Sequence, residues 1–143
     1  MRISLGADDA APVVDAVIEE LRRRGHELQV YEPVQWPDVA YKVALDVAQG
    51  RADQGVLFCW TGTGTSMVAN KVPGVRAALA WEAWIAEGAR LWNDANVLVM
   101  SLKRTTPETA LEILEAWFKV DEAEASEAAN IRRIAEIEQH YGT

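Results

Sequence analysis

Apolar residues along the chain follow two alternating patterns, short continuous runs and longer segments with apolar residues at helical spacing. The short runs are typical of strands and occupy residues 2–5, 27–31, 55–59, 75–81 and 96–102. The longer segments are typical of amphipathic helices and occupy residues 12–24, 38–49, 65–70, 82–91 and 107–118. Pro12 suits a first helical turn and Gly25 a helix end, so both ends of the first helix are marked.

The alternation of strands and helices predicts one domain over residues 1–143 with an α/β fold. Its five-stranded parallel sheet should carry helices on both faces, because short connections return each helix to the sheet. Ligands of such sheets lie outside the carboxyl ends of the strands. That rule selects the residues that follow four of the strands: Asp8, Asp9, Cys59 to Gly64, Trp81, Glu82 and Ser101 to Arg104.

The C-terminal segment, residues 121–143, has a different pattern. We expect a long charged helix over residues 122–141, in which Ile131, Ile134 and Ile137 form a narrow apolar stripe. A sheet already covered on both faces leaves this stripe no obvious place to pack. The stripe therefore predicts a contact with a partner subunit, in a homodimer or a tetramer built from one.

Charge and cysteine usage narrow the class of protein. The chain has 22 acidic and 14 basic residues and a formal net charge of -8, which argues against a nucleic-acid partner. Cys59 is the only cysteine and cannot form an intrachain disulfide, which fits a reducing cytoplasm. No run approaches the roughly 20 apolar residues that a membrane span requires. We therefore expect a cytoplasmic protein that does not enter a membrane.

The stretch "LFCWTGTGTSMVANK" ends a strand at Cys59 and enters a turn with two glycines, Gly62 and Gly64. Glycines allow backbone N–H groups to converge on an anion, but a plain tight turn explains them equally well. A cysteine in a strand is commonly a small buried hydrophobe. At a strand end before a helix it is also a candidate base, since that position favours a thiolate. Converging N–H groups would stabilise the enediolate that such a base creates.

Three segments carry a resemblance to a known family: "GADDA", "GVLFCWTGTGTSMVANKVPGVRAAL" and "ARLWNDANVL". They resemble the ribose-5-phosphate isomerase B and galactose-6-phosphate isomerase family, and the similarity covers nearly the whole chain. The resemblance implies a Rossmann-like three-layer α/β/α sandwich and a dimer with active sites at the subunit interface. It also implies aldose–ketose isomerisation of a sugar phosphate through an enediolate, without a metal or another cofactor. Zinc-ligand spacing is likewise absent from the sequence.

The resemblance also implies a role for particular residues. Cys59 matches the base that moves a proton between C1 and C2. The loop that holds the enediolate oxygens matches Thr61 to Gly64, including Thr63, and Ser66 follows on the helix. Asp8 matches an aspartate that contacts the sugar and assists ring opening. The remaining substrate-binding matches are Asn93 in "NDANVL" and Lys103, which lies near a family arginine after the fifth strand.

Several positions depart from the family pattern. Asp9 and Trp92 stand where the family has histidines, the second of which opens the sugar ring. Trp60 replaces the glycine after the cysteine. In the tail, "EAANIRR" replaces a phosphate-binding group, and Arg133, or its neighbour Arg132, is the cation that remains. Trp60 and Trp92 are the tryptophans most expected to line a pocket, whereas the others, including Trp36, are expected mainly to pack.

These departures weaken the predicted hold on a cyclic, dianionic sugar phosphate, because charge-assisted hydrogen bonds carry phosphate binding. The sequence therefore predicts an isomerase for an altered sugar, either short, open-chain or weakly phosphorylated. The alternative is a family member without catalysis, which binds a small ligand or serves as a subunit of a mixed isomerase.

Overall fold

Five parallel strands form a single sheet in the order β2-β1-β3-β5-β4 in the computed structural model, which describes residues 1–142. The strands are β1 (Arg2–Ala7), β2 (Glu27–Val30), β3 (Gln54–Cys59), β4 (Ala77–Leu79) and β5 (Val97–Ser101). All six residues of the central strand β3 are buried, as expected for a strand covered on both faces. The parallel sheet that the alternating pattern predicts is confirmed.

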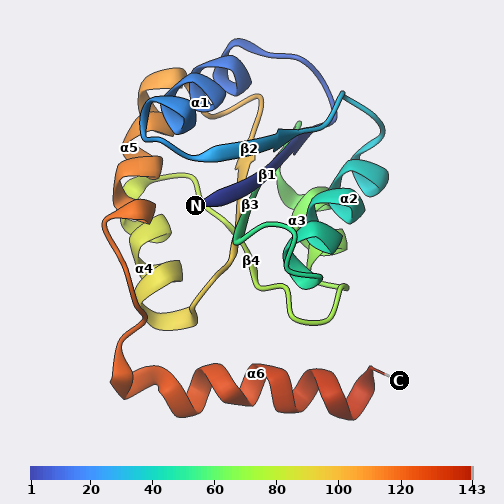
Figure 1. Cartoon of the computed structure of the whole chain (residues 1–143), viewed down its shortest axis with the longest axis vertical. Helices are drawn as coiled ribbons and strands as arrows, with labels where there is room; N and C mark the ends of the chain where they lie inside the picture. The colour runs from blue at the N-terminus through green and yellow to red at the C-terminus, as the bar shows by residue number, and fades with distance from the viewer. Residues whose placement is uncertain (143) are drawn as a thin grey trace.

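Helices cover both faces of the sheet (Figure 1). One face carries α1 (Pro12–Arg23), α4 (Ala83–Asn93) and α5 (Pro107–Phe118), and the other carries α2 (Trp36–Ala48) and α3 (Thr63–Ala69). The two apolar clusters between these layers are separate, and Phe58 and Trp117 are the largest side chains of the first. The buried Trp117 indole donates to Gln54 Oε1 at 2.8 Å, so its polar atom is satisfied. The three-layer Rossmann-like sandwich is therefore confirmed.

Most predicted elements differ from the structure by one or two residues at an end, and two of the differences have a local cause. The strand expected over residues 75–81 is only β4, because the Val75 N–H closes a turn onto the Val72 carbonyl at 3.1 Å. The helix expected from residue 122 begins later, as a 3₁₀ turn (Ala125–Glu127) followed by α6 (Ala128–Tyr141). The Glu124 N–H donates to the Leu91 carbonyl at the end of α4 at 2.8 Å. That backbone bond satisfies a helix-end carbonyl and keeps the preceding residues out of a helix.

The long C-terminal helix α6 lies across one end of the molecule, beyond the amino ends of the strands (Figure 1). The Glu138 carboxylate accepts a hydrogen bond from the Gly74 N–H at 3.1 Å. Ile134 and Ile137 stay 42% and 46% exposed, so the apolar stripe of α6 is only partly covered within one chain. Among the helices of residues 1–142, none has the length and apolar character that crossing a membrane needs.

A buried carboxylate ties the first strand to α2. Asp46 accepts hydrogen bonds from Ser4 Oγ at 2.8 Å, Tyr31 Oη at 2.6 Å and Arg51 Nε at 2.8 Å. Burial by itself raises the pKa of Asp46, but these donors and the Arg51 charge outweigh it and lower the pKa below 3.8. Burial and the bond to Asp46 also raise the pKa of Tyr31 to about 12, so the phenol still donates at neutral pH.

Replacing this carboxylate should destabilise the fold in a pH-dependent way. A carboxylate whose pKa is lower in the folded state adds stability above its unfolded pKa, and that stability is lost as pH falls through the folded pKa. We expect Asp46→Asn to lower the free energy of unfolding by about 1–3 kcal/mol at neutral pH. The difference from the wild type should shrink at about pH 3. Urea unfolding at both pH values measures it.

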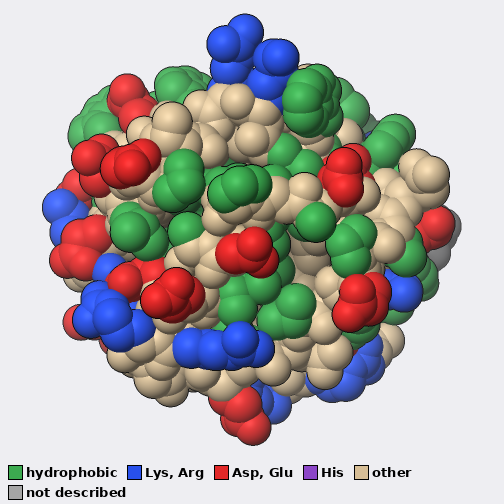
Figure 2. Space-filling model, turned by 90° about the horizontal axis from the view of Figure 1, so that it is seen from above, with side chains coloured by type: hydrophobic (Ala, Val, Ile, Leu, Met, Phe, Trp, Pro, Cys, Tyr) green, Lys and Arg blue, Asp and Glu red, His purple; other side chains and the backbone are tan. Residues whose placement is uncertain are grey.

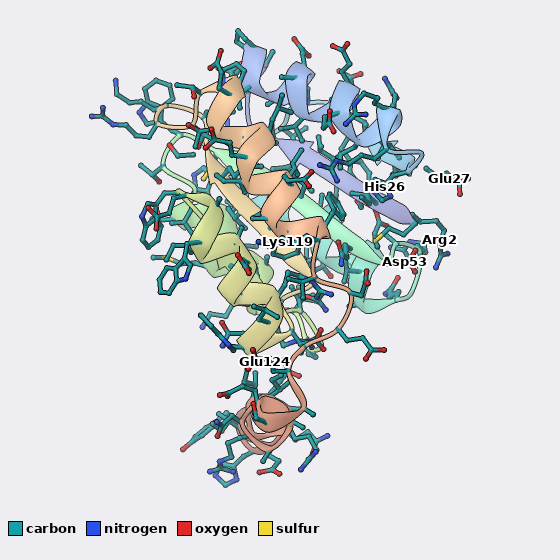
Figure 3. All side chains as sticks on the ribbon, turned by 90° about the vertical axis from the view of Figure 1, so that its left-hand side faces the viewer. Arg2, His26, Glu27, Asp53, Lys119 and Glu124 are labelled. Atoms are coloured by element: carbon teal, nitrogen blue, oxygen red, sulfur yellow. The ribbon has the colours of Figure 1, made fainter. Side chains whose placement is uncertain are left out.

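The matched control is Asp53→Asn. Asp53 pairs with Arg2 at 3.2 Å at the amino edge of the sheet, and its side chain is 45% exposed (Figure 3). An exposed ion pair contributes about 0–1 kcal/mol, so this variant should lose clearly less stability. Equal losses for the two variants, or a loss at Asp46 that does not depend on pH, would contradict the assignment.

Candidate active site

The carboxyl ends of three neighbouring strands bring the predicted site residues together. In the register of the sheet, Ala7 lies opposite Phe58, and Cys59 lies opposite Ser101. The Asp8 N–H donates to the Phe58 carbonyl at 3.3 Å, which holds Asp8 beside the last turn of β3. Chain segments far apart in the sequence therefore meet around Cys59.

Cys59 is 4% exposed and its sulfur has a specific donor. Thr65 Oγ1 lies 3.3 Å from Cys59 Sγ and also 3.3 Å from the Gly62 carbonyl oxygen. A hydroxyl has a single proton, so it donates to one of these acceptors at a time. Donation to the sulfur stabilises a thiolate. Sequence reasoning missed Thr65, and the available signal was its place one helical turn beyond the glycine turn.

The loop after Cys59 and the first turn of α3, which begins at Thr63 and not at Thr65 as expected, present unused donors. Thr61 Oγ1 and Thr63 Oγ1 lie 2.7 Å apart, and the Thr63 N–H points to Thr61 Oγ1 at 3.3 Å. Within residues 1–142, the backbone N–H groups of Gly62 and Gly64 donate to no protein acceptor. The loop can therefore supply both hydroxyl and N–H donors to a bound oxyanion.

A cavity of about 220 Å³ opens beside the cysteine, lined by Asp8, Trp36, Cys59, Trp60, Thr61, Thr63 and Gly64. The Trp36 indole from α2 lies directly over Gly64, where a Cβ would come within 2.9 Å of the Trp36 ring. The sequence analysis expected Trp36 mainly to pack, whereas the structure places it in the cavity wall. The volume is several times the roughly 30 Å³ of a water molecule, which leaves room for a small sugar.

The two aspartates after β1 differ in environment. Burial raises the pKa of Asp8, its own backbone hydrogen bond partly opposes this, and the charge of Asp9 adds to the rise. A carboxyl group with a raised pKa holds a proton more readily than a free aspartate does. Asp9 is exposed, and its carboxylate accepts the Ala10 N–H at 2.8 Å. Only Asp8 lines the cavity.

Trp60 separates this cavity from a second one. The second cavity has about 410 Å³ and is lined by Trp60, Thr61, Leu79, Ala80, Trp81, Ser101, Lys103, Arg104 and Thr105. Trp60 is 60% exposed, and Lys103 Nζ lies 5.0 Å from its ring centroid. On the side of the molecule away from α6, exposed hydrophobic side chains lie among scattered charged groups (Figure 2).

Several predicted site residues line neither cavity: Asp9 and Gly62 beside the loop, and also Ser66, Trp92, Asn93 and Arg133. Trp92 and Asn93 end α4, at the opposite edge of the sheet, where the Asn96 carbonyl accepts the Gly55 N–H at 2.9 Å. Gly55 is four residues before Cys59, so about 13 Å separates the two edges. Arg133 pairs with Glu136 on α6 at 3.1 Å. Ser66 is half-buried in α3, one turn beyond the loop.

Trp92 packs within its own helix, against Trp84 at 5.9 Å between ring centroids and over Gly88. Asn93 lines a third cavity of about 660 Å³ together with Ile134, Ile137 and Tyr141 of α6. One chain therefore brings together the residues from β1, β3 and β5, but not those from the ends of α4 and α6.

As for metals, residues 1–142 contain no cluster of three or more His, Cys, Asp or Glu side chains that could hold an ion.

A parallel α/β sandwich with a cysteine and a donor loop at the carboxyl edge defines a class of small-molecule enzymes. The family model described as Ribose/Galactose Isomerase matches residues 3–137. The chain therefore belongs to this family of sugar-phosphate isomerases, which are intramolecular oxidoreductases, as its motifs predict.

Individual relatives agree with this assignment. Ribose-5-P isomerase B of Listeria innocua is 32% identical, covering 97% of this chain and 98% of its own. D-erythrulose-4-phosphate isomerase of Pectobacterium atrosepticum is 33% identical, covering 96% and 95%. The solved structure of Clostridium thermocellum ribose-5-phosphate isomerase B superposes with a TM-score of 0.93 at 34% identity, covering 99% and 100%.

Gly62 offers a direct test of the loop geometry. Its φ is +84°, and a Cβ there would lie 2.5 Å from Leu79 Cδ1 and 3.2 Å from the Met100 backbone. Gly25 has nearly the same φ, +87°, with no atom within 4 Å, and it serves as the control. We expect Gly25→Ala to cost about 1 kcal/mol of unfolding free energy. Gly62→Ala should cost at least about 1 kcal/mol more, because the added Cβ would clash with the Leu79 side chain and crowd the Met100 backbone.

Thermal and urea unfolding of the two alanine variants measure the difference. Similar losses for Gly62→Ala and Gly25→Ala would show that the loop after Cys59 yields easily, against the close packing described.

Proposed function

We propose that this chain is an aldose–ketose isomerase in which Cys59 moves a proton between C1 and C2 of an open-chain sugar. The observation that carries the proposal is the position of Cys59 Sγ, which lines a sugar-sized cavity and accepts a hydrogen bond from Thr65. Membership of the isomerase family supports the reaction type. A cavity of about 220 Å³ beside the thiol also speaks against a site filled by tryptophan.

The proton transfers balance within the substrate and one side chain. The Cys59 thiolate takes the proton from C2 of the aldose, and the C2–H electron pair forms the C1–C2 double bond. The C1 carbonyl electrons move to O1, which gives an enediolate. The thiol then returns the proton to C1, while the hydroxyl proton passes from O2 to O1, and the ketose results.

The neighbouring residues have complementary roles in this proposal. The N–H groups of Gly62 and Gly64 donate to the enediolate oxygens, where the charge develops. Of the Thr61 and Thr63 hydroxyls, which are hydrogen-bonded to each other, one donates to the same oxygens. Asp8 is the group that passes the hydroxyl proton between O2 and O1, since it lines the cavity beside Cys59 and burial raises its pKa.

The proposed substrate is a short sugar phosphate that stays open-chain. The relative in Pectobacterium atrosepticum is named for D-erythrulose 4-phosphate, a four-carbon ketose. Its 4-hydroxyl carries the phosphate, so this sugar cannot close a five-membered ring and needs no ring-opening histidine. Asp9 and Trp92, which replace the family's histidines, fit such a substrate. Ribose 5-phosphate, for which other relatives are named, is the comparison compound.

We further propose that the active form is a cytoplasmic homodimer whose sites are shared between two chains. Asn93, Trp92 and Arg133 lie at the edge of the sheet opposite Cys59, and the α6 stripe is only partly covered. A second copy that packs on α6 and the end of α4 would bring these residues to its own Cys59. Such an arrangement would give Arg133 an anionic substrate group to bind.

The chemical role of Cys59 is tested by exchange in heavy water. Wild-type protein incubated with erythrose 4-phosphate, erythrulose 4-phosphate or ribose 5-phosphate should incorporate deuterium at C1 or C2, as followed by NMR. Cys59→Ala should lose about 10²–10⁴-fold of this rate. Thr65→Val, which removes the donor to the sulfur, should lose about tenfold.

Thr109→Val on α5 is the control for the loss of a hydroxyl, and it should exchange at the wild-type rate. Exchange that persists in the Cys59→Ala protein, or that is absent from the wild type with all three sugars, refutes the proposed reaction for this panel.

Sharing of the site is tested by mixing two inactive variants. Cys59→Ala and Asn93→Ala proteins should each be weakly active. Equal amounts that are unfolded and refolded together should recover about a quarter of the wild-type activity, because half the dimers then hold one intact site. Full activity of Asn93→Ala alone, a monomeric mass in analytical ultracentrifugation, or no recovery on mixing would each contradict shared sites.

A further inference from the structure

The second cavity, which Trp60 separates from Cys59, has the size and lining of a binding site. We propose that this Trp60–Trp81 cavity binds a flat, negatively charged ring, next to the sugar held at Cys59. Its volume of about 410 Å³ is nearly twice that of the cavity beside the thiol. A short sugar in the first cavity leaves this second space unused.

The walls of the Trp60–Trp81 cavity suit a planar group. Trp60 and Trp81 come from the loops after β3 and β4, and both stay more than half exposed, at 60% and 63%. Leu79 and Ala80 form an apolar floor between them. Exposed indoles are costly to leave in water and stack well on flat rings, offset or edge to face. Such walls favour an aromatic or heteroaromatic ring over a chain of hydroxyls.

The charges around the cavity select the sign of the ligand. Lys103 and Arg104 line it, and no Asp or Glu does, although acidic residues outnumber basic ones in the chain by 22 to 14. The Lys103 ammonium already lies over the Trp60 ring at 5.0 Å. A ring that carries a phosphate or a carboxylate would stack on indole and pair its anion with these cations.

The backbone holds this cavity in shape before any ligand arrives. The Trp60 carbonyl accepts hydrogen bonds from Ser101 Oγ at 2.8 Å and from the Lys103 N–H at 3.2 Å. The Leu102 N–H donates to the Cys59 carbonyl at 2.9 Å, and Ser101 Oγ also accepts the Arg104 N–H at 3.0 Å. A pre-organised site loses less entropy when it binds. These bonds also join the loop that carries Lys103 to the loop that carries Cys59.

Because Trp60 and Thr61 line both cavities, a ligand in one changes the wall of the other. A bound ring should therefore change the apparent KM for the sugar. This last consequence rests on the proposed isomerase function, whereas binding of the ring itself does not.

Direct binding tests the proposal with two probes, phenyl phosphate and inorganic phosphate, followed by calorimetry and by tryptophan fluorescence. The ring should make phenyl phosphate bind at least about tenfold more tightly than inorganic phosphate. Trp81→Ala should remove most of that difference, and Lys103→Gln should weaken both probes. Trp84→Ala is the matched control, since Trp84 is 61% exposed on α4 and lies outside the cavity.

Equal affinities for the two probes, or a ring preference that survives in Trp81→Ala, would overturn the proposal. So would a fall in the mass of the assembly caused by Trp81→Ala, because the cavity would then be an interface between copies. If the wild-type protein binds the ring but shows no deuterium exchange, the isomerase function alone is refuted. Intact exchange with no ring preference would refute this second site alone.

Discussion

Burial of β3 on both faces is the constraint on which the rest of this structure depends. Every residue of that strand is buried. α2 packs on one side of it, and Trp117 of α5 packs on the other, where it donates to Gln54. A strand buried on both faces reaches the surface only at its ends. At the carboxyl end, the chain leaves the sheet between the ends of the two neighbouring strands. Cys59 is the last buried residue of that path, and Trp60 is the first exposed one.

At the carboxyl end of β3, backbone hydrogen bonds position the residues of the candidate site more than any single side chain does. The carbonyls of Phe58, Cys59 and Trp60 accept N–H groups from the segments that follow β1 and β5. These bonds satisfy polar groups at the sheet edge, and at the same time they join three loops in one rigid unit. The same joining explains why two cavities lie side by side and share a wall.

Much of this could be predicted from local patterns. Five strands, the helices between them and the carboxyl-edge position of Asp8 and Cys59 follow from periodicity and from the rule for parallel sheets. Trp36 and Thr65 could not be predicted in the same way. Trp36 belongs to the wall because α2 crosses over Gly64, and Thr65 because the turn at Gly62 directs its hydroxyl back to the sulfur. The place of Thr65 one helical turn beyond the glycine turn was a weak signal, whereas the Trp36 contact leaves no mark in the spacing of residues.

The sequence by itself determined the α/β class, the family and the place of Cys59 at a strand end, because these depend on residue order and short-range spacing. Tertiary structure decided which side chains share a cavity, since that depends on how distant segments pack. It placed Trp92, Asn93 and Arg133 at the amino end of the sheet, whereas Cys59 lies at the carboxyl end. It also placed Trp81 beside Trp60, in the wall of one cavity. The C-terminal helix also begins later than the sequence predicts, because the Glu124 N–H donates to the Leu91 carbonyl at the end of α4.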